Sequence, residues 1–261
     1  MDEPRHITYY NTQARLRKEF LHPGGKSATE TLISQLPALT EDSVVLELGC
    51  GVGTTGKLLL KRSSCRYVGL DASPLMVYRA RSRLGSYKER ALVLRCDLKE
   101  REIPLISNSI DAIVAESVVA MLRPREIIGE CYRVLKRSGV LALNDRIWGE
   151  MITPEERSRV NDLCRKNYGI RAAPEELATA AKWQNLLKAV GFEIVALQRL
   201  QQQGEDNSLS WSTGLRRLRN GWAMVVHPST IATYIQDRKV AHQYSDIWKK
   251  MENWIFIARK K

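Results

Sequence analysis

Residues 44–56 read VVLELGCGVGTTG, a short apolar run followed by a loop with glycine at positions 49, 51 and 53. The apolar run predicts a buried strand, and the residues from Thr54 onward predict the start of a helix. Glycine lets the backbone turn tightly and lets a ligand approach closely, because no Cβ atom intervenes. The first turn of the helix adds unpaired amide donors and a partial positive charge. This stretch therefore predicts a loop that binds an anionic or carboxylate-bearing ligand.

The following residues alternate between short apolar runs and longer amphipathic stretches. Such alternation predicts βαβ units, that is, a parallel sheet with helices on both faces. We expect strands at residues 43–48, 66–70, 91–95, 109–115 and 139–143, and helices at residues 54–61, 74–84 and 124–135. The expected fold class is therefore α/β, with a doubly wound sheet.

The flanking segments are expected to be largely helical. Before the first strand we expect a helix over 13–20, a turn at residues 23–25, and a helix over 28–35 that a capping box between Ser27 and Glu30 opens. After the fifth strand we expect helices at 154–167, 174–190 and 229–251, strands at 191–197 and 254–258, and a surface loop at 201–210.

The composition is that of a globular protein. The chain has 261 residues, of which 44% are apolar and 27% are charged, close to ordinary averages. It has no apolar stretch of the roughly 20 residues that a bilayer crossing needs, and its first residues lack the features of a secretory signal. The five cysteines include no C-x-x-C pair, which argues against a zinc site or a disulfide framework. We expect a cytoplasmic protein with reduced thiols and no metal.

The net charge of +12 raises the question of a nucleic-acid partner. Most of the excess lies on two expected surface helices, around residues 57–62 and 79–90. Aromatic side chains do not interleave with these charges in the way that a base-stacking platform requires. A solvated basic face is therefore favoured, and RNA remains an alternative partner.

The glycine loop alone fits two classes of nucleotide-binding protein. Gly51-Val-Gly53-Thr-Thr-Gly56 matches the G-x-G-x-x-G fingerprint, and Asp71 lies 20 residues beyond Gly51, near the spacing of the acid that binds a dinucleotide ribose. This motif alone leaves a nicotinamide- or flavin-dependent oxidoreductase open.

Further motifs, in order along the chain, favour the other class. The loop is better described as E-x-G-x-G-x-G over residues 47–53, which resembles the first motif of the class I S-adenosylmethionine-dependent methyltransferases. Residues 67–73, YVGLDAS, resemble the second strand of that family, and residues 95–98, RCDL, resemble the end of its third strand. Residues 136–143, KRSGVLAL, resemble its turn into the fifth strand, with the turn kept by Gly139 alone.

This resemblance covers about residues 40–200 and the terminal strand, and it implies an architecture. It implies a Rossmann-like seven-stranded sheet, mostly parallel, with an antiparallel last strand. The N-terminal helical cap would span residues 1–40. The cofactor-binding core would span 41–200, with a helical insertion at about 148–172, and residues 201–261 would supply a cap helix and the last strand.

The resemblance also implies S-adenosyl-L-methionine as cofactor and a set of residues that bind it. It assigns the glycine loop to the methionyl end, Asp71 to the ribose hydroxyls, and Asp97 with Leu98 to the adenine. For Glu47, a bond to the cofactor ammonium and a structural bond to the loop amides both stay open. The expected cofactor-binding residues are Glu47, Gly49, Cys50, Gly51, Gly53, Asp71, Ala72, Asp97, Leu98 and Glu116.

Two residues are candidates for a catalytic base. Glu116 follows an apolar strand, where burial would raise its pKa toward that of a useful base. His22 would serve if the N-terminal cap closes over the site, although a structural role beside a Pro-Gly turn is the alternative. The candidate acceptor-binding residues are Tyr10, Asn144, Arg146 and Trp148, with a lid over the cofactor as an alternative role for Tyr10 and its neighbour Tyr9.

The acceptor is expected to be a small organic molecule with a ring or apolar body. All six tryptophans follow the fifth strand, and Trp148, Trp211, Trp222 and Trp248 are expected to line an apolar pocket over the cofactor. Trp183 and Trp254 are expected to belong to the core. The alternatives are an RNA methyltransferase, a non-catalytic S-adenosylmethionine-binding protein and a dinucleotide oxidoreductase.

Overall fold

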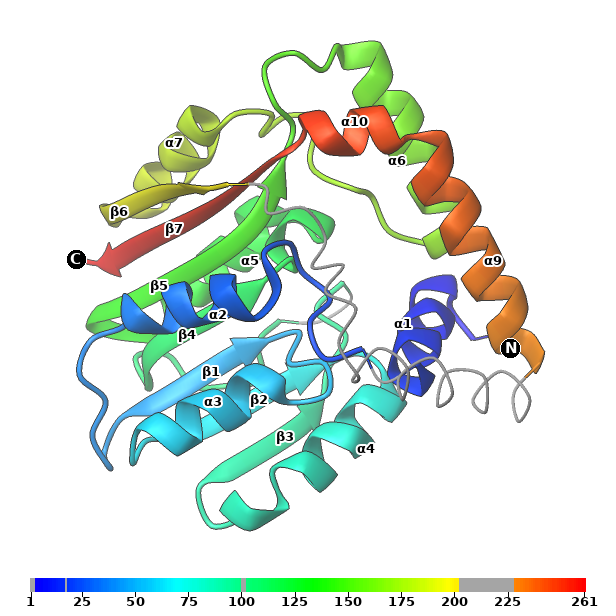
Figure 1. Cartoon of the computed structure of the whole chain (residues 1–261). Helices are drawn as coiled ribbons and strands as arrows, with labels where there is room; N and C mark the ends of the chain where they lie inside the picture. Colours follow the sequence, from blue (N-terminus) through cyan, green and yellow to red (C-terminus); the bar gives the residue numbers. More distant parts are fainter. Residues whose placement is uncertain (1–2, 17, 100–101, 202–227) are drawn as a thin grey trace.

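A seven-stranded sheet forms the centre of the molecule, which is a computed structural model that describes residues 3–16, 18–99, 102–201 and 228–261 (Figure 1). The strand order is β3-β2-β1-β4-β5-β7-β6. The strands are β1 (Val44–Leu48), β2 (Arg66–Asp71), β3 (Ala91–Arg95), β4 (Ile110–Glu116), β5 (Leu135–Ile147), β6 (Phe192–Leu200) and β7 (Glu252–Lys260). Strands β1 to β5 are parallel, whereas β7 pairs antiparallel with both β5 and β6. The fold class expected from the sequence is confirmed.

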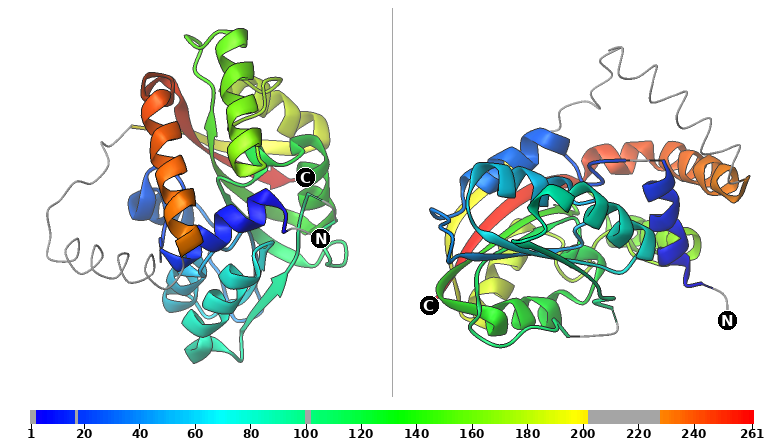
Figure 2. Two further views of the ribbon diagram at one scale, coloured as in Figure 1. Left: turned by 90° about the vertical axis from the view of Figure 1, so that its right-hand side faces the viewer. Right: turned by 90° about the horizontal axis from the view of Figure 1, so that it is seen from below.

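Helices cover both faces of the sheet (Figure 2). Helices α2 (Gly25–Ser34), α3 (Thr54–Arg62) and α4 (Pro74–Arg83) lie on one face, and α5 (Pro124–Val134) and α7 (Ala180–Val190) lie on the other. Successive strand residues point to opposite faces, so Val45 joins the apolar cluster beneath α3 while Leu46 joins the cluster beneath α5. Burial on both faces explains why these strands are continuous apolar runs in the sequence.

The order of the strands fixes where a ligand can bind. The chain winds outward from β1 to β3 and then returns to β4 on the other side of β1. At such a reversal the loops after the two central strands diverge and leave a crevice at their carboxyl ends. The glycine loop follows β1 and Glu116 ends β4, so both lie at this edge.

Four helices form a cap beyond that edge (Figure 1). They are α1 (Arg5–Arg15), α6 (Pro154–Tyr168), α9 (Pro228–Gln243) and α10 (Ser245–Lys250). Helix α1 contacts α4, α6 and α9. Trp148, which is fully buried, packs with Val160 of α6 and Ile247 of α10 in a separate apolar cluster. The cap therefore has a core of its own.

The N-terminal predictions were wrong in two respects. The helix expected at 13–20 is α1, which begins after Pro4 and ends at Arg15. Its buried residues include Ile7, Asn11 and Ala14, which follow helical spacing. Because Asn11 is polar, these positions do not form an apolar periodic pattern in the sequence. The capping box at Ser27 and Glu30 is absent, because α2 begins earlier, after Gly24, with no side-chain hydrogen bond to its N-terminus.

Three later elements differ from their expected bounds. Helix α7 starts at residue 180 rather than 174, because Thr179 accepts a hydrogen bond from the Lys182 amide and caps the helix there. The expected helix over 229–251 is divided at Tyr244 into α9 and α10. Strand β5 extends beyond 139–143 at both ends. The loop expected at 201–210 lies almost wholly outside the described residues.

The turn into β5 depends on two residues rather than one. Ser138 adopts the left-handed conformation, with φ of 63°. Gly139 has an ordinary φ, but a Cβ atom there would come within 2.8 Å of the Lys136 carbonyl oxygen. The expectation that Gly139 alone keeps this turn was therefore incomplete.

Within the described residues, no helix has the length and apolarity to cross a bilayer. All five cysteines are buried and unpaired.

Trp183 tests how the last helix holds the sheet. Its indole is fully buried between α7 and β7, with its ring 5.8 Å from that of Phe256. We expect Trp183→Ala to lower the free energy of unfolding by about 3–5 kcal/mol, because a large cavity forms. Trp183→Phe should cost less than half as much, since the indole nitrogen has no hydrogen-bond partner in the described structure.

Urea denaturation followed by circular dichroism measures both changes. Lys188→Ala, an exposed site on the same helix, is the control and should stay within about 0.5 kcal/mol of the parent. Equal losses for the alanine and phenylalanine variants would contradict this role for Trp183.

Candidate functional site

The glycine loop has the backbone that the sequence predicted. Gly49, Gly51 and Gly53 have φ angles of 65°, 51° and 77°, which side chains disfavour. A Cβ atom on Gly49 would collide with the side chain of Val118, whereas one on Gly51 would meet nothing within 4 Å. Gly51 therefore faces open space that a ligand could approach.

Asp71 connects this loop to the neighbouring strand. One carboxylate oxygen accepts the Gly51 amide at 2.8 Å, and the other accepts the Ser73 amide at 2.9 Å. Burial raises the pKa of Asp71 to about 6, although the two amides oppose the shift. Each carboxylate oxygen has two lone pairs, so both can accept a further hydrogen bond from a ligand hydroxyl.

Helix α1 lies across the carboxyl ends of β2 and β3 and contacts the residues expected to bind adenosine. The His6 ring nitrogen Nε2 lies 2.8 Å from an Asp97 carboxylate oxygen, and the second oxygen accepts the Lys99 amide at 3.0 Å. The Ser73 hydroxyl donates to the Asn11 side-chain oxygen at 2.7 Å. Two polar contacts from one helix thus reach both aspartate-bearing loops.

Tyr10 lies on the same helix, beside the two aspartates rather than at the acceptor end. Its hydroxyl donates to the Met121 sulfur at 3.4 Å. Burial raises the pKa of Tyr10, and the charges of Asp71 and Asp97 raise it further. This position fits the lid role better than the acceptor-binding role.

Glu116 is the centre of a buried polar cluster assembled from four elements. Its carboxylate accepts hydroxyl bonds from Thr29 of α2 and Thr55 of α3, both at 2.9 Å. The Asn144 amide of β5 donates to it at 3.3 Å, and His22 Nε2 lies 3.2 Å from it. The side chains of His22 and Glu116 are only 7% and 5% exposed. The structure therefore brings both candidate bases into direct contact.

Glu47 is buried beneath the glycine loop. Its carboxylate accepts a 2.5 Å hydrogen bond from the Tyr67 hydroxyl. Burial raises the pKa of Glu47 well above its ordinary value, the Tyr67 hydrogen bond opposes that shift, and the charge of Glu116 adds to it. This geometry favours the structural alternative for Glu47.

Two buried polar atoms near Glu116 have no hydrogen-bond partner in the described part of the chain, the Ser117 hydroxyl and the Asn144 side-chain oxygen. The neighbouring Asp145 carboxylate is buried within reach of the Val119 and Ala120 backbone amides. Burial raises the pKa of Asp145, and the backbone amides of Val119 and Ala120 oppose that shift. Polar atoms left unpaired in this way are typical of a site that a polar ligand or water completes.

The other predicted residues occupy distinct places. Cys50 and Leu98 are buried in the apolar clusters on the two faces of the sheet, and the Ala72 carbonyl accepts the Arg95 guanidinium at 3.3 Å. Trp148 belongs to the cap core, and Arg146 stacks on Trp248. Trp183 and Trp254 pack in or against the main core as expected. Trp211 and Trp222 lie outside the described residues.

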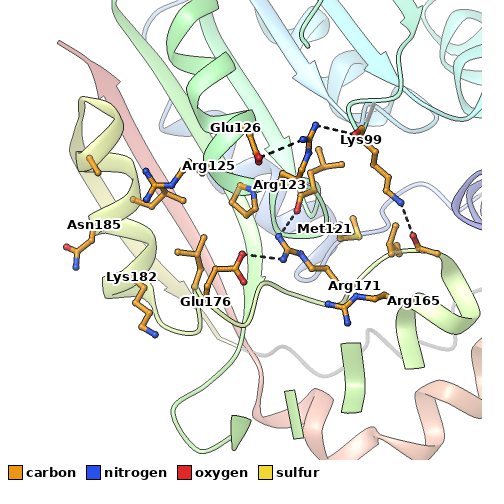
Figure 3. A pocket seen from close by; sticks show the side chains of 17 residues that line it. Lys99, Met121, Arg123, Arg125, Glu126, Arg165, Arg171, Glu176, Lys182 and Asn185 are labelled. Atoms are coloured by element: carbon orange, nitrogen blue, oxygen red, sulfur yellow. Dashed lines mark hydrogen bonds and ion pairs between the residues drawn. The ribbon is translucent and has the colours of Figure 1, made fainter. Parts of the chain in front are cut away.

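A groove of about 1020 Å³ lies beside the N-terminal end of α5 and along α7, and none of the predicted site residues lines it (Figure 3). Two acidic side chains, Glu126 and Glu176, face it. Among the described residues that line it, none is aromatic. Its basic side chains are Lys99, Arg123, Arg125, Arg165, Arg171 and Lys182.

Sequence reasoning missed four residues of the site. Thr29 and Thr55 bind Glu116, and His6 and Asn11 bind the adenosine-side loops. Thr55 could have been suspected, because it lies in the first helical turn after the glycine loop. The other three had no local signal, since their partners lie 62 to 91 residues away in the chain.

The sheet order, the glycine loop and the two aspartates define a Rossmann-like methyltransferase fold. Residues 46–143 match the family described as methyltransferase domain. The uncharacterized methyltransferase YodH of Bacillus subtilis is 28% identical over 92% of this chain and 93% of its own length. Together, the family match and this relative support a class I S-adenosylmethionine-dependent methyltransferase.

Two further matches have more divergent sequences. Sterol 24-C-methyltransferase of Eremothecium gossypii is 24% identical over 88% of this chain and 60% of its own length. The structure of geranyl diphosphate C-methyltransferase from Streptomyces coelicolor, in complex with geranyl diphosphate and S-adenosyl-L-homocysteine, superposes with a TM-score of 0.64. It is 13% identical and covers 90% of this chain and 80% of that one.

Tyr67→Phe tests the support of the buried Glu47 carboxylate. We expect the free energy of unfolding to fall by about 1–3 kcal/mol at pH 8, because a buried acceptor loses its donor. Burial raises the folded-state pKa of Glu47, so its stabilising contribution is largest at low pH and is lost as pH rises. The deficit of the variant should therefore shrink at pH 5.

Chemical denaturation at both pH values provides the measurement. Tyr78→Phe, whose ring is 70% exposed, is the matched control and should show no deficit. A Tyr67→Phe deficit that grows as pH falls would refute this account.

Proposed function

We propose that this methyltransferase acts on a small organic acceptor, which binds at the carboxyl ends of β4 and β5 beside His22 and Asn144. The observation that carries the proposal is the cluster around Glu116. Thr55 joins that cluster to the first turn after the glycine loop, while Asn144 and His22 join it to β5 and the N-terminal cap. A donor in the loop and an acceptor over β5 would then meet at these side chains.

The residues of the crevice fit S-adenosylmethionine. The open space at Gly51 lets the ligand approach the backbone, and the free lone pairs of Asp71 suit two ribose hydroxyls. The unpaired buried side-chain oxygen of Asn144 supplies an acceptor for a further polar group. Bound there, the cofactor supplies a methyl group already activated on a sulfonium.

Because the methyl group arrives activated, the chain mainly has to orient the acceptor and exclude water. Orientation of this kind is worth about 7–11 kcal/mol of barrier. Helix α1 closes the adenosine side through His6 and Asn11, and the cap around Trp148 closes the other side. Both features favour a small acceptor that fits under a closed cap.

His22 is the better placed of the two candidate bases. Its Nδ1 lies 3.3 Å from the Asn144 amide nitrogen and 3.2 Å from the Pro23 carbonyl oxygen. In the tautomer whose Nε2–H donates to Glu116, Nδ1 is the acceptor for the Asn144 amide. Glu116 then holds the ring and stabilises its protonated form, which is the role of a carboxylate behind a histidine base. An acceptor hydroxyl or amine would displace the Asn144 amide and transfer its proton to Nδ1.

RNA is the second candidate acceptor, and the basic groove is the observation that favours it. Six basic side chains line that groove against two acidic ones. Because its described lining has no aromatic side chain to stack on bases, we rank RNA below a small molecule.

The binding of S-adenosylhomocysteine should depend on pH through Asp71. Burial places the pKa of this carboxyl at about 6, and only the ionised form accepts both ribose hydroxyls. Affinity should therefore rise up to about tenfold per pH unit below pH 6 and level off above about pH 7. Asp71→Asn should weaken binding by about 10- to 100-fold and abolish the pH dependence.

Isothermal titration calorimetry between pH 5 and pH 8 measures these affinities. Asp42→Asn, an exposed site, removes the same charge and should leave affinity unchanged. Full affinity in Asp71→Asn would overturn the cofactor assignment.

Transfer of a labelled methyl group to fractionated cell extract tests the acceptor class and the base together. We expect the label in a small molecule; label in RNA would favour the second candidate. With the labelled fraction as substrate, His22→Asn should lower kcat by about 10²- to 10⁴-fold, and Glu116→Gln should lower it by a smaller factor. Affinity for S-adenosylhomocysteine should be unchanged in His22→Asn.

Helix α2 offers the control for this series. Glu30→Gln alters an exposed surface ion pair with Arg62 and should leave kcat unchanged. A kcat of His22→Asn within twofold of the parent would exclude it as the base.

A further inference from the structure

Arg146, near the carboxyl end of β5, is a cation with no acidic partner in the part of the chain that the structure describes. It lies two positions beyond Asn144, so both side chains leave the strand on the same face. Its Nε donates to the Asn253 side-chain oxygen at 3.3 Å, and its guanidinium carbon lies 5.6 Å from the centre of the Trp248 ring. Among the described residues, no carboxylate lies within ion-pair distance of Arg146.

Three other partly or fully buried cations in the described part of the chain have more oxygen partners than Arg146. Lys260 donates to the Asn108 side chain and to two backbone carbonyl oxygens. Arg90 donates to three backbone carbonyl oxygens. Arg171 donates to two and also pairs with Glu176. Arg146 receives one amide oxygen from the described residues, so its oxygen shell is incomplete by comparison.

The surroundings of Arg146 make this incompleteness costly. Its chain neighbours Asp145 and Ile147 are buried, and Cys164 of the cap lies close enough to interact with its charge. Burial lowers the pKa of Arg146, and the residue is only partly exposed to solvent. A desolvated charge needs a counter-charge or a full set of hydrogen bonds.

The contacts of Arg146 also orient it. Asn253 accepts from Nε and the guanidinium carbon lies over the Trp248 ring, and neither contact uses the two terminal nitrogens. Two parallel N–H groups match two oxygens of a carboxylate or a phosphate. A neutral acceptor would offer no such match.

We propose that the methyl acceptor carries an oxyanion, a carboxylate or phosphate, that pairs with the terminal nitrogens of Arg146. The inference rests on the proposed function, which places the acceptor beside His22 and Asn144. The anion would then lie on the β5 side of the reacting atom, under the cap formed by α6 and α10.

Thermal unfolding with simple probes tests the proposal without the natural acceptor. We expect benzoate, phenyl phosphate or both to raise the Tm of the parent protein, and neutral benzamide to leave it unchanged. The two anions distinguish a carboxylate site from a phosphate site. In Arg146→Met the anion-dependent rise should disappear, whereas Arg146→Lys should keep a smaller one.

If Arg146 had a purely structural role, Arg146→Met would lower the Tm of the protein. Without anions, Arg146→Met should unfold at a Tm equal to or above that of the parent, because an uncompensated charge is replaced by an apolar side chain. Arg159→Met, at an exposed site on α6, is the control and should keep the anion response. The proposal is overturned if neither anion shifts the parent, if the shift survives in Arg146→Met, or if that variant unfolds well below both parent and control.

The Tm rise caused by S-adenosylhomocysteine is recorded in the same samples. It should be the same in the parent and in Arg146→Met. Its absence from the parent would contradict the proposed cofactor site, while the anion response would still report on Arg146 separately.

Discussion

The contact between the Asp71 carboxylate and the Gly51 amide is the constraint on which the site depends. It connects the loop after β1 to the end of β2 through a 2.8 Å hydrogen bond. Only a residue that tolerates positive φ can present its amide in this way, which is why glycine occupies position 51. The same carboxylate keeps lone pairs for a ligand, so one acid both shapes the loop and serves the site.

Much of the fold could be predicted because its strands are buried on both faces. Such strands are continuous apolar runs, and the loops that follow them carry ordered motifs, so β1 to β5 were found close to their true positions. Helix α1 was misplaced because four of its six buried side chains are polar. His6 and Asn11 are buried against partners on β-strand loops far along the chain, and no local pattern contains that information.

The residues of the candidate site were likewise predictable from the sequence only in part. Asp71, Asp97 and the glycines were readable because each lies inside a motif next to a strand. The polar cluster at Glu116 was only partly readable, because the hydroxyls of Thr29 and Thr55 come from two helices on one face of the sheet. Threonine has no sequence signature for such a role, and only the packing of α2 against β5 brings Thr29, His22 and Asn144 together.

The position of α1 bears on how fast the protein could turn over. The helix bridges the two nucleoside-side loops through His6 and Asn11, and it packs Ala14 against Val52 of the glycine loop. In the proposed cofactor site, exchange of spent nucleoside for fresh nucleoside would require this bridge to detach, with about 0.5–1.5 kcal/mol lost for each ordinary hydrogen bond and more for the one to a carboxylate. Detachment of a small element of this kind occurs in microseconds to milliseconds. In this proposal the gate and the chemistry are carried by separate parts of the chain, so the rate of release would change without any change at Glu116 or His22.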